Sequence, residues 1–280
     1  MLTIRRPLPL SAEQALAAQF RGTPLGSQWM WTRASAVPEA VAPTLHSLQE
    51  HPLLHGVAAQ LRGDDLIGQG VDAQRYIGET AWHSDGHSED GGWTAKFMLY
   101  LDDVDESTGC LHVFPGSHLF RGEEHAAFQA FISAAPFGAV PGRAVPTRPG
   151  DVIVFNTNVF HGSTGGGINR RVINIDYQLN PTTREGERAL IDSCEKTAKG
   201  RDHPVVRTFP FNYSKEWLGN RSGNPVRQHW IDRWRELGCL DGLQVAEGGP
   251  MPEQLQENGR IAALNEAHSR AAAANADARL

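Results

Sequence analysis

Hydrophobic and polar positions change their spacing along this chain of 280 residues. Up to about residue 63, apolar residues recur at spacings of three and four, interrupted by Pro43 and Pro52, which predicts several short helices. Beyond that point the apolar residues form short β-rich runs bounded by Gly, Pro, Asp and Asn. A helical spacing returns over 227–237, and the end of the chain is rich in alanine.

The many short β-rich runs predict an antiparallel sandwich or barrel. Turn signals such as Pro115-Gly116-Ser117 and Pro149-Gly150-Asp151 separate the runs. No low-complexity linker divides the chain, so we expect one domain over residues 1–280. Its expected parts are N-terminal helices (about 1–63), a β core (about 64–180), a C-terminal helical and loop extension (about 181–253) and an Ala-rich tail (about 254–280).

Composition narrows the classes of function. The net charge is −6, from 26 Lys and Arg against 32 Asp and Glu, whereas nucleic-acid-binding proteins normally carry a basic excess. Three cysteines stand far apart without a CxxC motif, which predicts reduced thiols and a cytoplasmic location. No apolar run approaches the roughly 20 residues of a transmembrane helix, and no signal-peptide pattern is present. We therefore expect neither nucleic acid nor a membrane as a partner; oligomeric state is not predicted.

The chain is rich in histidine, with 12 residues, and one group of them suggests a metal site. His83 and Asp85 stand two positions apart on an extended segment, so both side chains would share one face and could bind one metal. Roughly 1.4 His-x-acid pairs are expected by chance, and the chain contains a second pair, His87 and Glu89. The spacing alone therefore does not identify the metal site, and the choice between the two pairs depends on the flanking residues.

The flanking residues form an ordered series of motifs. The series comprises Trp82 before His83, a strand ending in Asp102-Asp103, Gly109-Cys110-Leu111, Pro115-Gly116-Ser117-His118, Gly150-Asp151 before a strand, His161-Gly162-Ser163, and Arg170. This series resembles the phytanoyl-CoA dioxygenase (PhyH)-like family of Fe(II)/2-oxoglutarate-dependent oxygenases, over roughly residues 64–180.

The resemblance implies a mainly β fold with flanking helices, built on a double-stranded β-helix (jelly-roll, cupin-like) core. It implies that His83, Asp85 and His161 bind Fe(II), with 2-oxoglutarate and O2 as cosubstrates. Halogenating relatives replace the carboxylate ligand with a small residue, so the presence of Asp85 favours oxygen chemistry. We expect a dioxygenase that hydroxylates a C–H bond of a small polar metabolite or natural product and releases succinate and CO2. The alternatives are a cupin-type metal enzyme that does not use 2-oxoglutarate and a non-catalytic jelly-roll binding protein.

The far carboxylate of 2-oxoglutarate needs a cation, because burying a charge without a partner is costly. Arg170 and Arg171 are adjacent, so on a strand they face opposite ways. Arg171 alternates with large apolar residues, whereas Arg170 alternates with Asn174 and Asp176, which suits a polar interior. The alternation therefore selects Arg170, in agreement with the resemblance, which also implies that Ser163 assists it.

Five further residues are candidates for contacts with the cosubstrate or the substrate. Lys96 lies in the middle of a strand, where a buried ammonium should meet an anion such as 2-oxoglutarate. Arg75 and Tyr76 directly precede the metal-binding strand, His87 follows it, and His112 lies in a later β run. For all five, the alternative is an ordinary strand or surface role.

Overall fold

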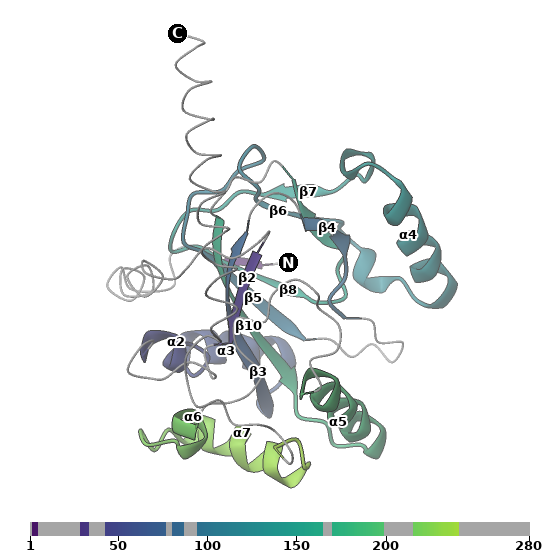
Figure 1. The fold of residues 1–280 in the computed structure, drawn as a ribbon. Coiled ribbons are helices and arrows are strands. Elements are labelled where there is room, and N and C mark those ends of the chain that lie inside the picture. Colours follow the sequence, from purple (N-terminus) through teal and green to yellow (C-terminus); the bar gives the residue numbers. More distant parts are fainter. Residues whose placement is uncertain are drawn as a thin grey trace, which may run out of the picture.

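The computed structural model of this chain describes residues 2–4, 29–33, 43–76, 80–86, 94–164, 170–198 and 215–240. These residues form two antiparallel β-sheets with helices around them (Figure 1). None of the helices in these ranges combines the length and apolarity needed to cross a bilayer.

The larger sheet carries most of the core, and its strands come from distant parts of the chain. In spatial order its strands are β1 (Leu2–Ile4), β8 (Val152–Asn156), β5 (Ala95–Tyr100), β10 (Arg170–Leu179), β3 (Leu66–Tyr76) and β2 (Trp29–Arg33).

The smaller sheet contains β4 (Thr80–His83), β9 (His161–Ser163), β6 (Leu111–Val113) and β7 (Arg143–Val145), in that order. Neighbours in both sheets are rarely consecutive in sequence, and every pair is antiparallel. This is the expected jelly-roll core.

Helices pack on the side of the larger sheet that faces away from the smaller one (Figure 1). They are α2 (Pro43–Leu48), α3 (Pro52–Arg62), α6 (Lys215–Gly219) and α7 (Pro225–Glu236). Helix α4 (Gly122–Ala134) lies beside the smaller sheet (Figure 1). A further helix, α5 (Arg184–Ala198), follows β10 in the chain.

The two faces of β10 belong to different apolar clusters. Ile173, Ile175 and Tyr177 pack with residues of the covering helices, including Leu54 and Trp230. On the other face, Val172 packs with apolar residues of both sheets, which joins the sheets into one barrel. The alternation along β10 therefore separates a helix-covered side from the barrel interior.

The strands β3 to β10 fall within the β core expected over about 64–180, and the helical spacing over 227–237 corresponds to α7. The expectation of helices from residue 1 is wrong at 2–4 and 29–33, which form edge strands of the larger sheet. Local spacing cannot reveal such strands, because they exist through pairing with β8 and β3. The Ala-rich tail lies outside the described residues, and the single-domain organisation stays a prediction.

Candidate metal centre

Strands β4 and β9 bring the predicted metal ligands together. His83 lies directly opposite His161 in the register, and their ring centroids are 4.3 Å apart. Asp85 follows β4, with Oδ1 3.4 Å from His83 Nε2 and Oδ2 3.4 Å from His161 Nε2. One ligand atom from each residue lies within 4.8 Å of the others, so the three can hold a single metal ion.

Backbone carbonyls fix the orientation of both imidazole rings. His83 Nδ1 lies 2.8 Å from the carbonyl oxygen of Ala81, and His161 Nδ1 lies 2.9 Å from that of Val159. Because a carbonyl oxygen only accepts hydrogen bonds, each Nδ1 carries the proton and donates. Each Nε2 therefore turns its lone pair toward Asp85, which is the arrangement that metal-binding histidines use.

The loop between β8 and β9 holds the backbone of Asp85 in place. The backbone N–H groups of Asp85 and Gly86 both donate to the carbonyl oxygen of Thr157, at 3.1 and 3.2 Å. A Cβ at Gly86 would lie 2.7 Å from Asn158 Oδ1 and 2.9 Å from Thr157 Oγ1, so a larger residue here would have to displace these two side chains. The glycine after the carboxylate thus lets the β8–β9 loop approach Asp85 closely.

Trp82 supports β4 from the face opposite the metal ligands. Its side chain is buried, stacks on Phe137 at 4.8 Å and donates from Nε1 to the Phe137 carbonyl oxygen at 3.0 Å. His112 contacts the same Phe137 ring, at 5.3 Å. Because His112 pairs with Gly162, it shares the face of Gly162 and not that of His161. The expectation that His112 points into the site is therefore wrong.

Charges and burial around the site place Asp85 and His161 in their metal-binding forms. Burial raises the pKa of Asp85, but the Lys96 ammonium, 2.6 Å from Oδ2, and the His161 imidazole outweigh burial and hold that pKa well below its ordinary value. Burial lowers the pKa of His161 despite the neighbouring carboxylate. Burial also opposes the charged form of His83, but the hydrogen bond and charge of Asp85 raise its pKa overall. Asp85 is thus ionised and His161 neutral at pH 7.

The two adjacent arginines point to opposite sides of β10, as the alternation predicted. Arg170 is buried, donating from Nη2 to Ser163 Oγ at 2.9 Å and from Nη1 to the carbonyl oxygen of Gly109. Arg171 pairs with Asp102 on the outer side, at 2.6 Å, and its backbone N–H donates to the same carboxylate. Ser163 stands two residues after His161 on β9, so both face the interior.

The structure brings Lys96 to the metal ligands, but it does not place every candidate. Tyr76 lies opposite Arg170 in the register and Arg75 lies opposite Arg171; their side chains are outside the described part of the chain. His87 also lies outside the described residues. Their contacts with substrate stay predictions.

Sequence reasoning missed three supports of the site. These are Phe137 beneath Trp82, Thr157 at the Asp85 backbone, and Phe155, whose ring lies 4.9 Å from His161. Each lies far along the chain from the residue it supports, and no local pattern marks it.

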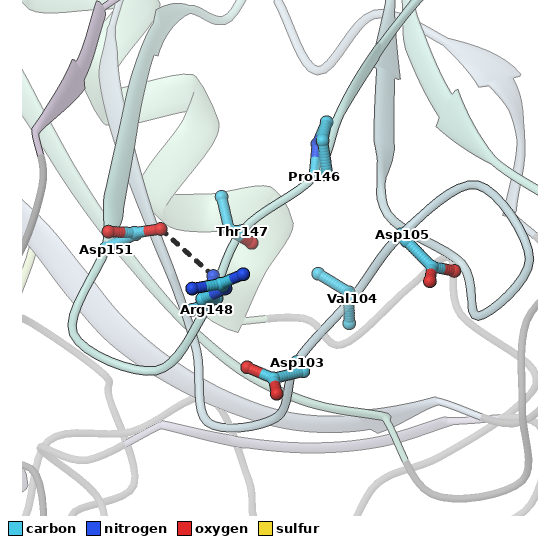
Figure 2. A pocket seen from close by; sticks show the side chains of 7 residues that line it. All are labelled: Asp103, Val104, Asp105, Pro146, Thr147, Arg148 and Asp151. Carbon is cyan, nitrogen blue, oxygen red and sulfur yellow. Dashed lines mark hydrogen bonds between the residues drawn. The ribbon is translucent and has the colours of Figure 1, made fainter.

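A hollow of about 670 Å³ lies between the loop after β5 and the loop before β8 (Figure 2). Its lining residues are Asp103, Val104, Asp105, Pro146, Thr147, Arg148 and Asp151. The Asp151 carboxylate accepts the backbone N–H of Arg148 at 3.0 Å, and Asp105 Oδ1 accepts four hydrogen bonds from Ser107 and Thr108. These carboxylates shape their loops. Within the described ranges, only His83, Asp85 and His161 converge as possible metal ligands.

Comparisons with known proteins agree with this geometry. The family model described as phytanoyl-CoA dioxygenase (PhyH) matches residues 13–172. No curated protein matches the chain.

Several solved structures are similar in fold. The epimerase SnoN from nogalamycin biosynthesis is 20% identical with a TM-score of 0.52, over 64% of this chain and 78% of that one. AviO1 from Streptomyces viridochromogenes Tue57 is 22% identical with a TM-score of 0.51, over 65% and 90%. HygX from Streptomyces hygroscopicus, solved with nickel and 2-oxoglutarate, is 16% identical with a TM-score of 0.51, over 64% and 82%. At these identities the likeness shows a shared fold.

Proposed function

Because the chain belongs to the phytanoyl-CoA dioxygenase family, we propose that it is an Fe(II)- and 2-oxoglutarate-dependent oxygenase. The observation that carries the proposal is the convergence of His83, Asp85 and His161. Two imidazoles and one carboxylate on one side of a metal leave the other positions open, which is the donor set of non-haem Fe(II) oxygenases. In support, SnoN was solved with Fe3+ and α-ketoglutarate, and HygX with nickel and 2-oxoglutarate.

The site also offers a place for 2-oxoglutarate. His161 and Ser163 are alternate residues of β9, so the backbone positions of the metal ligand and of the serine that accepts from Arg170 are about 6.8 Å apart along the strand. A five-carbon diacid can bridge this separation, with its keto-acid end at the metal and its far carboxylate at Arg170. A guanidinium suits that carboxylate because its fork of N–H donors can bind both oxygens.

In this mechanism the protein orients and protects the reactants. Bound iron would supply the activation of O2. The carbonyl oxygens of Ala81 and Val159 hold the two imidazoles in position, and Thr157 holds the backbone of Asp85. The ring of Phe155 covers His161, which keeps water from this side of the site.

We propose hydroxylation of a C–H bond in a small polar metabolite or natural product, with release of succinate and CO2. Retention of Asp85 supports oxygen transfer, because a carboxylate ligand occupies the position that a halide would need. Epimerisation is a second candidate, since SnoN is described as an α-ketoglutarate-dependent epimerase. Relatives solved with hygromycin B and nogalamycin RO support a natural-product substrate. The cytoplasmic location stays a prediction from the sequence.

Anaerobic titration with Fe(II) and then 2-oxoglutarate tests the proposal. We expect a weak visible charge-transfer band that His161→Ala abolishes. His229→Ala is the matched control, because it removes a half-exposed histidine on α7. If the native protein gives no band and binds no 2-oxoglutarate, the proposal is wrong.

The reaction type is then read from the products. Succinate release should be screened over candidate substrates, with mass spectrometry of each product. A gain of one oxygen atom indicates hydroxylation, and an unchanged mass with altered stereochemistry indicates epimerisation.

A further inference from the structure

Lys96 places a positive charge directly against the candidate metal ligands. We propose that the charge of Lys96 weakens the affinity of the centre for the metal ion and strengthens its affinity for the anionic cosubstrate. This inference rests on the proposed function, since it assumes that the site binds a divalent metal and a dicarboxylate.

The position of Lys96 follows from the sheet. On β5 it pairs with Asp176 of β10 on one side and with Phe155 of β8 on the other. Phe155 contacts the ring of His161, so this row of the sheet faces the metal ligands. The side chain of Lys96 is only 15% exposed, and its Nζ lies 2.6 Å from Asp85 Oδ2.

The oxygen that binds Lys96 is also the oxygen nearest His161. Asp85 Oδ2 lies 2.6 Å from the ammonium and 3.4 Å from His161 Nε2. Any metal held by His161 and Asp85 therefore shares its carboxylate ligand with the ammonium. The ammonium withdraws charge from that carboxylate and repels a dication nearby, and partial burial limits screening by solvent. Both effects weaken metal binding relative to a neutral residue at position 96.

The same charge has the opposite effect on an anion. A dicarboxylate that reaches the metal brings two negative charges into a site whose own carboxylate, Asp85, repels it. Lys96 offsets the charge of Asp85 at hydrogen-bonding distance. Arg170 stands on β10, where it bonds Ser163, and so attracts the far end of the anion only. Lys96 therefore favours the end of the anion that approaches the metal.

Opposite shifts of two affinities distinguish this role from a purely structural one. Binding of Mn(II) should be measured by calorimetry and by loss of the free Mn(II) EPR signal. Binding of 2-oxoglutarate to the Mn(II)-saturated protein is then measured by calorimetry. In Lys96→Met we expect the Kd for Mn(II) to fall, and the Kd for 2-oxoglutarate to rise, each by about tenfold or more. Lys96→Arg, which keeps the charge, should stay near wild type in both.

Arg171→Met is the matched control. It removes a cation whose carboxylate partner, Asp102, lies at the same 2.6 Å, but on the outer face of the sheet. We expect both affinities to stay near wild type in this variant. If Lys96→Met does not fold by circular dichroism, Lys96→Gln takes its place with the same expectations.

Two results would overturn the inference. If Lys96→Met binds Mn(II) more weakly, Lys96 acts by holding Asp85 in position, and the proposed weakening of metal affinity by its charge is wrong. If neither affinity changes, the charge has no influence on the centre. In both cases the wild-type protein still binds metal and 2-oxoglutarate. A wild-type protein that binds Mn(II) but no 2-oxoglutarate would instead contradict the proposed function itself.

Discussion

Gly162 stands between the metal ligand His161 and Ser163, at a point where β9 leaves no room for a side chain. A Cβ at this position would lie 2.9 Å from the carbonyl oxygen of Thr80 and 3.2 Å from the carbonyl carbon of Ala81. Both are backbone atoms of β4, so they cannot rotate away as the end of a side chain could. Gly162→Ala must therefore move β9 relative to β4.

The movement should affect stability and metal binding together. The Cβ would also lie 2.9 Å from Phe137 Cε2, so a side chain crowds the same position. Overpacking of this kind costs about 1–3 kcal/mol of unfolding free energy. For a chain of this size that lowers Tm by roughly 2–12 °C, at about 2–4 °C per kcal/mol. Displacing the support of a metal ligand lowers metal affinity by about 10- to 100-fold.

Thermal unfolding by circular dichroism and calorimetric titration with Mn(II) measure these two effects. Gly56→Ala in α3 is the control, because no atom beyond its chain neighbours and the backbone of its own helix lies within 4 Å of the added methyl group. It should leave Mn(II) affinity unchanged and raise stability by about 0.5–1 kcal/mol, since alanine favours the helix. A Gly162→Ala protein with the same Tm as wild type and the same Kd for Mn(II) would refute the reasoning.

Three further predictions concern the cosubstrate, the core and the metal. Arg170→Met should weaken 2-oxoglutarate binding by about 100-fold, since a charged hydrogen-bonded pair is worth about 2–5 kcal/mol, and should leave Mn(II) affinity within about twofold; calorimetry that shows equal 2-oxoglutarate affinity would contradict this. Arg227 and Glu50 form an ion pair in which the two side chains are 1% and 3% exposed. Arg227→Met breaks this pair and should lower the free energy of unfolding, measured in urea, by about 3–5 kcal/mol. A cost below about 1 kcal/mol would show that the buried pair adds little to stability. Mn(II) at about 100 times its Kd should raise stability by about 2.7 kcal/mol, and EDTA should reverse the rise in Tm; no shift would argue against a metal site.

Much of the site follows from the sequence, because its features depend on residues that are close in the chain. Strand alternation puts His161 and Ser163 on one face of β9, and Asp85 lies beside His83 just beyond the end of β4. Alternation also separates Arg170 from Arg171, and the structure places the first inside and the second outside.

Features that depend on strand pairing could not be predicted in the same way. Alternation allows two faces for His112, and only its pairing with Gly162 decides between them. Strands β1 and β2 replace expected helices because β8 and β3 offer them hydrogen-bonding edges.

The sequence by itself determined the family, the β-rich core and the three residues that converge as possible metal ligands. Only the tertiary structure decided what surrounds those ligands: Lys96 at Asp85, Phe155 at His161 and Phe137 beneath Trp82. The reason is physical. Local periodicity fixes the face on which a side chain lies, whereas its partner depends on the register between strands that are far apart in the chain.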